Sequence, residues 1–413
     1  MSAPYLLPTE PIQGTSPGQN TASEVFAPVR SLKRIEVLDG LRGLALFGII
    51  TANLWTFSGY GFLTEPQMQQ LPTYALDRLV YASLHVLIDS KFSTIFSILF
   101  GVGFSIQIGR AGSKGIAFTG YFIKRMLILL GIASVHAYAF WYGDIIRFYA
   151  VAGLLMLLAR NWSERRLLIT AVGLMALATP VIFILNEVFA APAADGLTKG
   201  QILTAFGQGA YPDVLRMNWR IDDVRNFWQG ASLTLVSTTG KVMLGYWMGR
   251  IGLFTNPQAH QRLLRRWFWW GALVGLPSSA VFWAVKSGSL TLTPGLAWLP
   301  FVIAIGMVLH SLFYISAFVQ AFQRLSWQRG LVTFVPVGKM ALTNYLTQTL
   351  VGLLLFYGYL PGPHLMGQVG PANLLLLGIT IYALQVVFSH WWLRTHEQGP
   401  VEWLWRKLSY RNS

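Results

Sequence analysis

The sequence predicts an all-α, polytopic integral membrane protein with about ten transmembrane helices and both termini in the cytoplasm. Hydrophobic residues make up 54% of the 413 positions and charged residues only 11%, whereas soluble domains carry about 25% charged residues. The apolar residues form long unbroken runs rather than the alternating pattern of a membrane β-barrel. Most Lys and Arg residues fall in the short connections between those runs.

Each expected span is a predominantly apolar run of about 20 residues, the length that crosses a bilayer core. In chain order the ten runs are Leu41–Tyr60, Phe92–Ile108, Phe122–Trp141, Ile145–Ala159, Leu167–Phe189, Ser232–Gly252, Trp267–Lys286, Leu296–Ala321, Ala341–Tyr359 and Ala372–Leu393. The fourth run is short, so we expect it to lie inside the bundle or to have snorkelling ends. A further helical segment, Tyr74–Ile88, is expected to be interfacial or re-entrant.

The predicted organisation is a single transmembrane domain between two cytoplasmic tails. Residues 1–30 are rich in Pro, Gly, Ser and Thr and are expected to be a disordered tail. The transmembrane domain covers residues 31–395, with an outer loop at about 190–231. That loop mixes acidic and basic residues with tryptophan, which fits either an amphipathic segment on the membrane surface or a polar substrate platform. Residues 396–413 are expected to form an amphipathic helix at the cytoplasmic headgroups.

The distribution of positive charge sets the expected orientation. With the N-terminus in the cytoplasm, 22 of the 31 Lys and Arg residues fall on the cytoplasmic side, as the positive-inside rule requires. This topology accounts for the net charge of +15 without a nucleic-acid partner, and it leaves membrane lipids as the expected partners. The chain has no cysteine, which excludes disulfides and thiolate chemistry. No His or carboxylate pair has the spacing of a metal site.

Two helices begin with an arginine and place a polar side chain eleven residues further on. Arg42 is followed by Asn53, and Arg125 is followed by His136. Asp39 lies three residues before Arg42, on the same helical face. Polar groups at membrane depth are costly and usually face a cavity or a partner helix. We therefore expect these side chains to converge on a water-accessible passage, with hydrogen bonding between helices as the alternative role for Asn53.

His136 is the first candidate for a general base. Asp144 and Arg147 follow it at the expected outer turn between the third and fourth spans. A histidine oriented by a carboxylate can accept a proton from a reacting hydroxyl. Asp144 is eight residues away, so only a bent chain or a bridging water would join the two side chains.

Two further groups of polar residues share helical faces. His85 and Asp89 are four residues apart and Lys91 follows, which predicts either an alternative dyad or a salt-bridge group at the membrane surface. Asn344 and Gln348 are also four apart, within the ninth span, and would face the polar interior together.

Five ordered motifs resemble the YeiB-like family of bacterial inner-membrane proteins, a domain of unknown function. They read "RIEVLDGLRGLALFGIITAN", "KFSTIFSILFGVGF", "VHAYAFWYGDIIRFYAVAGLL", "GKMALTNYLTQTL" and "GPVEWLWRKL" and extend from Arg34 to about Tyr410. That family is grouped with the transmembrane acyltransferase superfamily. The resemblance implies multi-pass insertion in a bacterial inner membrane and transfer of an acyl group from cytoplasmic acyl-CoA to a glycan or lipid hydroxyl on the far side.

The resemblance to the superfamily is incomplete at its catalytic position. In the superfamily's polysaccharide acyltransferases, a catalytic His stands where this chain has Asn53. The superfamily's lysosomal heparan-glucosaminide acetyltransferase has Asn at that position, with a His just beyond the helix. No His occurs between Leu54 and Asp77 here, so the resemblance makes His136, with Asp144 and Asn53, the expected catalytic group. Acyl-CoA or acetyl-CoA is the expected co-substrate, with no permanently bound cofactor. The residues expected to bind it or the acceptor are Asp39, Arg42, Lys91, Arg125, Arg147, Asn344 and Gln348.

The same departure supports an alternative. An amide at position 53 does not act as a base, so the chain is alternatively a non-catalytic transporter, lipid-binding protein or scaffold of the same fold. The basic cytoplasmic side favours the acyltransferase, whereas Asn53 favours the alternative. The acyl group, the acceptor and the oligomeric state are left open by the sequence.

Overall fold

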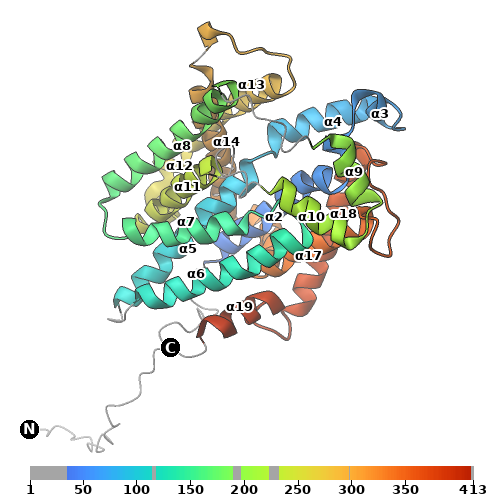
Figure 1. Ribbon diagram of the computed structural model, residues 1–413. Coiled ribbons are helices and arrows are strands. Elements are labelled where there is room, and N and C mark those ends of the chain that lie inside the picture. The colour runs from blue at the N-terminus through green and yellow to red at the C-terminus, as the bar shows by residue number, and fades with distance from the viewer. Residues whose placement is uncertain (1–34, 114–117, 189–196, 223–231, 297, 411–413) are drawn as a thin grey trace, which may run out of the picture.

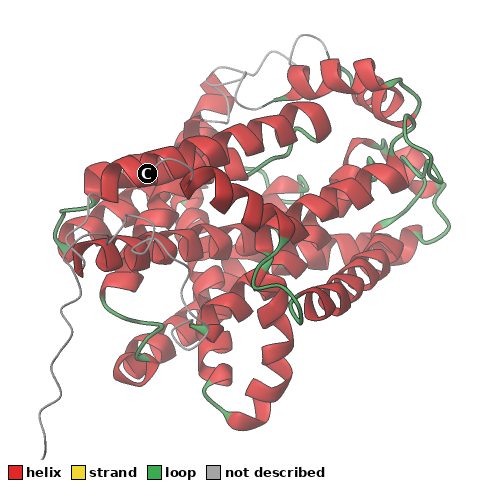
Figure 2. Ribbon diagram, turned by 90° about the horizontal axis from the view of Figure 1, so that it is seen from below, coloured by secondary structure: helices red, strands yellow, loops and turns green. Residues whose placement is uncertain are grey.

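Helices form most of the described part of each of the ten predicted spans in the computed structural model, which describes residues 35–113, 118–188, 197–222, 232–296 and 298–410. Figure 2 shows helices joined by loops, with no strand in these ranges. Within the described ranges, six helices are long and apolar enough to cross a membrane: Glu36–Phe57, Tyr74–Ala111, Phe118–Phe140, Pro257–Lys286, Leu299–Phe322 and Pro371–Trp392. The predicted all-helical membrane fold is thus confirmed, whereas the count of ten spans and the side of each terminus stay predictions.

The first half of the chain contains helices α2 to α10. In order they are α2 (Glu36–Phe57), η2 (Tyr60–Phe62), α3 (Glu65–Gln69), α4 (Tyr74–Leu87), α5 (Lys91–Ser113), α6 (Phe118–Val135), the π-helical turn η3 (His136–Phe140), α7 (Ile146–Ala159), α8 (Glu164–Val188), α9 (Lys199–Gly207) and α10 (Tyr211–Ile221). The expected outer loop therefore contains two short helices, α9 and α10. The predicted tail 1–30 lies outside the described residues.

The second half of the chain ends in helix α19, which contacts α6 and α17. Its elements are α11 (Ser232–Arg250), η6 (Pro257–His260), α12 (Gln261–Trp270), the π-helical turn η7 (Gly271–Gly275), α13 (Leu276–Lys286), η8 (Pro294–Leu296), α14 (Leu299–Phe322), α15 (Leu325–Leu331), η9 (Val332–Phe334), α16 (Val335–Lys339), α17 (Ala341–Phe356), α18 (Pro371–Trp392) and α19 (Pro400–Tyr410). The amphipathic helix predicted in the C-terminal tail is present as α19.

Helix α2 forms the centre of the bundle, with α5, α16, α17 and α18 packed around it (Figure 1). Small residues allow the closest of these approaches. A Cβ added at Gly43 would lie 2.1 Å from the carbonyl oxygen of Phe334, so only glycine fits there. The hydroxyl of Tyr382 on α18 donates a hydrogen bond to the Gly43 carbonyl at 2.7 Å. The polar start of α2 is consequently fixed against η9 and α18.

Helices α6 and α17 contact a helix at each end, and these contacts position the candidate site. Helix α19 lies across the beginnings of α6 and α17, at the bottom of Figure 1. At the opposite end of α6, the π-helical turn η3 contacts α10 and α17. A chemical group moving between α6 and α17 would therefore travel from the α19 end toward η3.

Candidate functional site

His136 and Asp144 are in direct contact, although eight residues separate them. Nδ1 of His136 lies 2.7 Å from Oδ2 of Asp144, and both side chains are buried. The chain widens into the π-helical turn η3 at His136 and then reverses before α7 begins at Ile146. This reversal supplies the bend that the sequence required. π-Helical turns of this kind are frequent at functional sites.

The two remaining polar atoms of this pair are also bound. Oδ1 of Asp144 accepts a hydrogen bond from the backbone N–H of Arg147 at 2.9 Å, in the first turn of α7. Nε2 of His136 lies 2.9 Å from the hydroxyl oxygen of Thr349 on α17. A carboxylate at Nδ1 holds the proton on that nitrogen and leaves Nε2 free to accept one. Thr349 is therefore the donor in its hydrogen bond to His136.

Arg147 connects this pair to α10. Its guanidinium binds both carboxylate oxygens of Asp222, at 2.8 and 3.0 Å, where α10 ends. The amide of Asn218, also on α10, donates to the backbone carbonyls of Tyr138 and Phe140 in η3. Bidentate Arg–carboxylate pairs are strong and directional. Helix α10, in the segment expected to be an outer loop, thus holds the turn that carries His136. Arg147 is not among the described residues that line the cavity described below.

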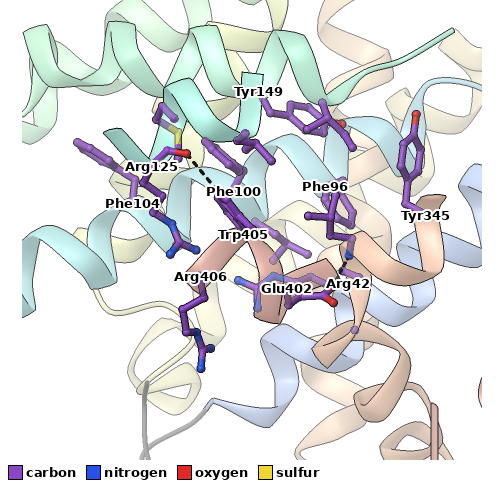
Figure 3. A pocket seen from close by; sticks show the side chains of 18 of the residues that line it. Arg42, Phe96, Phe100, Phe104, Arg125, Tyr149, Tyr345, Glu402, Trp405 and Arg406 are labelled. Atoms are coloured by element: carbon purple, nitrogen blue, oxygen red, sulfur yellow. Dashed lines mark hydrogen bonds between the residues drawn. The ribbon is translucent and has the colours of Figure 1, made fainter. Parts of the chain in front are cut away.

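A cavity of about 290 Å³ lies between α2, α5, α6, α7, α17 and α19 (Figure 3). Most of its wall is apolar, formed largely by α5 and α6, and in Figure 3 Phe96 and Phe100 lie between Arg125 and Tyr345. Its volume is near the lower end of small-ligand pockets, which begin at about 300 Å³. The cavity therefore suits a narrow, mainly apolar group rather than a whole nucleotide.

Four basic residues line the cavity near the α19 end, and we call them the basic end: Arg42, Lys339, Arg125 and Arg406. Arg42 is paired with Asp39 at 2.7 Å, as the sequence predicted. The guanidinium of Arg125 lies 3.8 Å from the ring centroid of Trp405, and its Nε is buried without a hydrogen-bond partner among the described residues. The basic end therefore keeps unused donor capacity beside an apolar cavity, which suits an anionic group.

Glu402 fixes α19 to the first turn of α17. Its carboxylate accepts hydrogen bonds from the backbone N–H groups of Leu342, at 2.6 Å, and Thr343, at 3.0 Å. These N–H groups belong to the beginning of a helix, where a negative charge is favoured. Burial nonetheless raises the pKa of Glu402, and the hydrogen bonds from Thr343 and Leu342 only partly oppose that rise. Glu402 also lines the cavity, so α19 forms part of its wall.

Tyr345 lies between the cavity and His136. It lines the cavity, and its ring centroid is 5.4 Å from that of the imidazole. Its hydroxyl is buried beside the backbone N–H of Ile145, and its own proton has no acceptor at hydrogen-bond distance among the described residues. His136 itself is not among the described residues that line the cavity, so a group in the cavity would reach the imidazole only past Tyr345.

The expected amide ligands are not at the cavity. Asn53 is partly exposed on α2 and is not one of the described residues lining the cavity. Asn344 donates to the carbonyl of Val337 and to the Ser389 hydroxyl. Gln348 donates to the Leu46 carbonyl and the Gln385 side chain. The side chains of Asn344 and Gln348 thus join α17 to α2, α16 and α18. The expectation that these polar side chains converge on one water-accessible passage is wrong for Asn344 and Gln348, which are bound within helix contacts.

The alternative dyad has a different geometry. Nε2 of His85 is 3.8 Å from the Asp89 carboxylate, and Nδ1 lies 3.0 Å from the Tyr81 carbonyl. Asp89 is closer to Lys286, at 3.1 Å. The ammonium of Lys91 is buried and donates to the His85 carbonyl at 2.9 Å. This group is held by its own contacts, and Lys91 is not among the described residues that line the cavity.

Sequence reasoning missed Thr349, Tyr345 and Asp222 as partners of the predicted groups. Thr349 and Tyr345 are four residues apart, in the motif "TNYLTQT", where the search for polar side chains selected only Asn344 and Gln348. A face-by-face examination of that helix would have placed the tyrosine and threonine on one side. No local signal could have joined Asp222 to Arg147, because 75 residues separate them.

Comparisons with known proteins agree with this fold. A model of the family "Protein of unknown function (DUF418)" matches residues 248–412. "Uncharacterized protein YxaH" of Bacillus subtilis is 31% identical, over 93% of this chain and 96% of that protein. "Uncharacterized protein YeiB" of Escherichia coli is 27% identical over 92% and 97% of the two chains, and an uncharacterized 39.9 kDa protein of Bacillus acidopullulyticus is 28% identical over 93% and 96%. The resemblance inferred from the five motifs is therefore confirmed, and the chain belongs to the YeiB-like DUF418 family of helical membrane proteins.

Proposed function

We propose that this protein is a membrane acyltransferase that accepts an acyl group from a CoA thioester and passes it to a hydroxyl group of a glycan or lipid. The observation that carries the proposal is the cavity, which joins a basic end to Tyr345, the neighbour of the His136–Asp144 pair. The donor enters at the basic end, which we assign to the cytoplasm of a bacterium. The acceptor arrives from the side of η3 and α10.

The donor's chemistry fits the two parts of the cavity. CoA combines a nucleotide carrying several phosphates with a thin arm that ends in the thioester. The phosphates remain outside, on Arg42, Arg125 and their basic neighbours, because guanidinium groups bind phosphate oxygens well. The arm enters between Phe96 and Phe100, where the volume of about 290 Å³ leaves room for a short acyl group.

We place the reaction beside Tyr345, at the inner end of the cavity and next to the His136–Asp144 pair. His136 accepts the proton of the attacking hydroxyl at Nε2, while Asp144 keeps the ring oriented and stabilises the imidazolium that forms. The O–H of Tyr345, whose proton has no acceptor among the described residues, is placed to donate a hydrogen bond to the thioester oxygen as that oxygen gains negative charge. These groups replace Asn53, Asn344 and Gln348, which the sequence had suggested for that purpose.

A substitution in the wall of the cavity tests this proposal without removing any of its polar groups. Gly103 on α5 lines the cavity, and a Cβ added there would have Arg42 as its nearest neighbour, at 3.8 Å. Gly103→Leu would therefore fill the cavity without displacing backbone. Gly109 is exposed on the same helix with nothing within 4 Å of an added Cβ, so Gly109→Leu is the matched control.

The measurement uses inverted membrane vesicles supplied with acetyl-CoA or octanoyl-CoA that carries a radioactive acyl group. We expect the wild type and Gly109→Leu to transfer label to membrane or lumenal material, and Gly103→Leu to transfer none. Thermal unfolding of both variants should match the wild type or exceed it, because leucine favours a helix over glycine by about 1 kcal/mol. Undiminished transfer by Gly103→Leu, or no transfer by the wild type with either thioester, contradicts the proposal.

A further inference from the structure

A hydroxyl, an imidazole and a carboxylate are lined up across α17 and the turn after α6. The Thr349 hydroxyl is 2.9 Å from Nε2 of His136, and Nδ1 of the same ring is 2.7 Å from Asp144. All three residues are at most 4% exposed. This order of groups is that of an activated hydroxyl nucleophile, with a base at the hydroxyl and an orienting carboxylate behind the base.

A second hydroxyl–imidazole pair in the bundle shows how an ordinary packing contact differs. Ser279 on α13 lies 2.8 Å from Nδ1 of His310 on α14. The Nε2 atom of His310 is buried without a hydrogen-bond partner among the described residues. The Ser279 hydroxyl also lies 3.1 Å from the Gly275 carbonyl of its own helix. No carboxylate orients this ring, so the pair simply joins two helices, whereas Thr349 faces a base that is already oriented.

We propose that Thr349 is a covalent acyl carrier, a step that rests on the proposed acyl transfer and deepens it. The Thr349 oxygen attacks the thioester carbonyl as His136 takes the hydroxyl proton. The C–S bond then breaks, and the CoA sulfur leaves with the proton that His136 returns. The products are free CoA thiol and an acyl ester on Thr349, with no oxidant or reductant consumed.

The second half of the cycle uses the same groups in reverse. An acceptor hydroxyl attacks the ester carbonyl and gives its proton to Nε2 of His136. The C–O bond to Thr349 breaks, and the proton passes to the Thr349 oxygen, which restores the starting hydrogen bond. A covalent carrier means that donor and acceptor need not be bound at the same time, which suits substrates that arrive from opposite sides of a membrane.

The position of Thr349 supports this role. Thr349 lies one helical turn beyond Tyr345, so the two side chains share a face of α17. The cavity ends at Tyr345, and a small rotation of that ring would bring a thioester from the cavity to the threonine. The surroundings of Thr349 are dry, since its own side chain is 1% exposed, and a dry site protects an ester from hydrolysis.

The test traps the ester on the full-length protein in lipid nanodiscs with acetyl-CoA and no added acceptor. We expect the wild type to release up to one equivalent of free thiol in a burst, and peptide mass spectrometry to find one acetyl group on Thr349. Thr349→Ala should give neither result, and Thr349→Ser should give both, because it keeps the hydroxyl. Ser279→Ala should behave as the wild type.

The outcomes separate this inference from the proposed function. If Thr349→Ala transfers label in vesicles at the wild-type rate, or if the wild type transfers label but never carries an acetyl group on Thr349, transfer is direct. The covalent step is then overturned while acyl transfer stands. If the wild type neither releases thiol in nanodiscs nor transfers label in vesicles, both proposals fail. The adduct on the wild type is decisive even if Thr349→Ala does not fold.

Discussion

The bundle contains two histidine–aspartate groups whose geometries differ in an instructive way. His136 and Asp144 are eight residues apart and form a direct hydrogen bond of 2.7 Å. His85 and Asp89 have the i, i+4 spacing that favours contact on a helix, yet their nearest nitrogen and oxygen are 3.8 Å apart. Spacing along the chain alone would have favoured His85 and Asp89, whereas the sequence analysis put His136 first.

The difference arises from what each ring touches. His85 is stacked against Trp55, with ring centroids 4.7 Å apart, and lies 4.5 Å from the ring of Trp283. These contacts and the Tyr81 carbonyl fix the ring where Asp89 is out of reach, and Lys286 takes the carboxylate. At His136 the helix widens and the chain turns back, so a distant carboxylate meets the ring. An irregular backbone, rather than a regular helix, creates the oriented histidine.

Replacing the histidine of each pair should give the largest difference in acyl transfer between the two groups. His136→Ala should lower acyl transfer in vesicles by about 10²–10⁴-fold, the usual contribution of a general acid–base group. His85→Phe keeps an aromatic ring between Trp55 and Trp283 and should leave the transfer rate unchanged. Rates are measured at equal amounts of folded protein, judged by size-exclusion profile and thermal unfolding. If His85→Phe lost activity while His136→Ala kept it, the roles of the two groups would be reversed.

Changing each carboxylate to an amide should have a smaller effect with the same contrast. Asp144→Asn retains the shape at Nδ1 but favours the tautomer in which Nε2 carries the proton, so the base is lost. We expect a fall in transfer rate of about 10²-fold, the lower end of the range for such groups, together with loss of the acetyl adduct at Thr349. Asp89→Asn should keep the wild-type rate. Equal rates for both variants would show that Asp144 does not orient the base.

How much the sequence could predict depended on how far apart the interacting residues lie. Unbroken apolar runs predicted the helices to within a few residues, because span length depends on local composition alone. The ion pair between Asp39 and Arg42 was also predictable, because residues three apart lie on the same face of a helix. Thr349 is 213 residues from His136, so their contact depends on how α17 packs against η3. No periodicity records that packing, and the search for charged and amide groups passed over the hydroxyls.

Charges near the two groups should differ in their effect on donor binding. Arg125 lines the cavity, and Arg125→Gln should raise the KM for acetyl-CoA by roughly 10-fold with kcat unchanged, because a charge-assisted hydrogen bond contributes about 1.5–3 kcal/mol. Lys286 belongs to the His85 group, so Lys286→Gln should leave KM unchanged. Initial rates over a range of acetyl-CoA concentrations separate the two parameters. A fall in kcat at constant KM for Arg125→Gln would show that this arginine does not serve in donor binding.

The smallest expected effect concerns helix α19, which lines the basic end of the cavity, at the end opposite to His136. Burial raises the pKa of Glu402, so the folded protein holds this proton more tightly than the unfolded chain does. The contribution of Glu402 to stability is therefore fully present below the ordinary pKa of glutamate, and it declines as pH rises through the raised value.

Glu402→Gln cannot titrate and should lack that decline. The measurement is the midpoint of thermal unfolding in nanodiscs, taken for the wild type and Glu402→Gln from acidic to neutral pH. The difference between the two midpoints should change with pH. His390, an exposed residue of α18 away from the cavity wall, provides His390→Gln as a control that leaves the Glu402 contribution in place. Parallel curves for the wild type and Glu402→Gln would mean that Glu402 has the same proton affinity folded and unfolded. The attachment of α19 to α17 would then be independent of pH, and the basic end of the cavity would stay covered under all of these conditions.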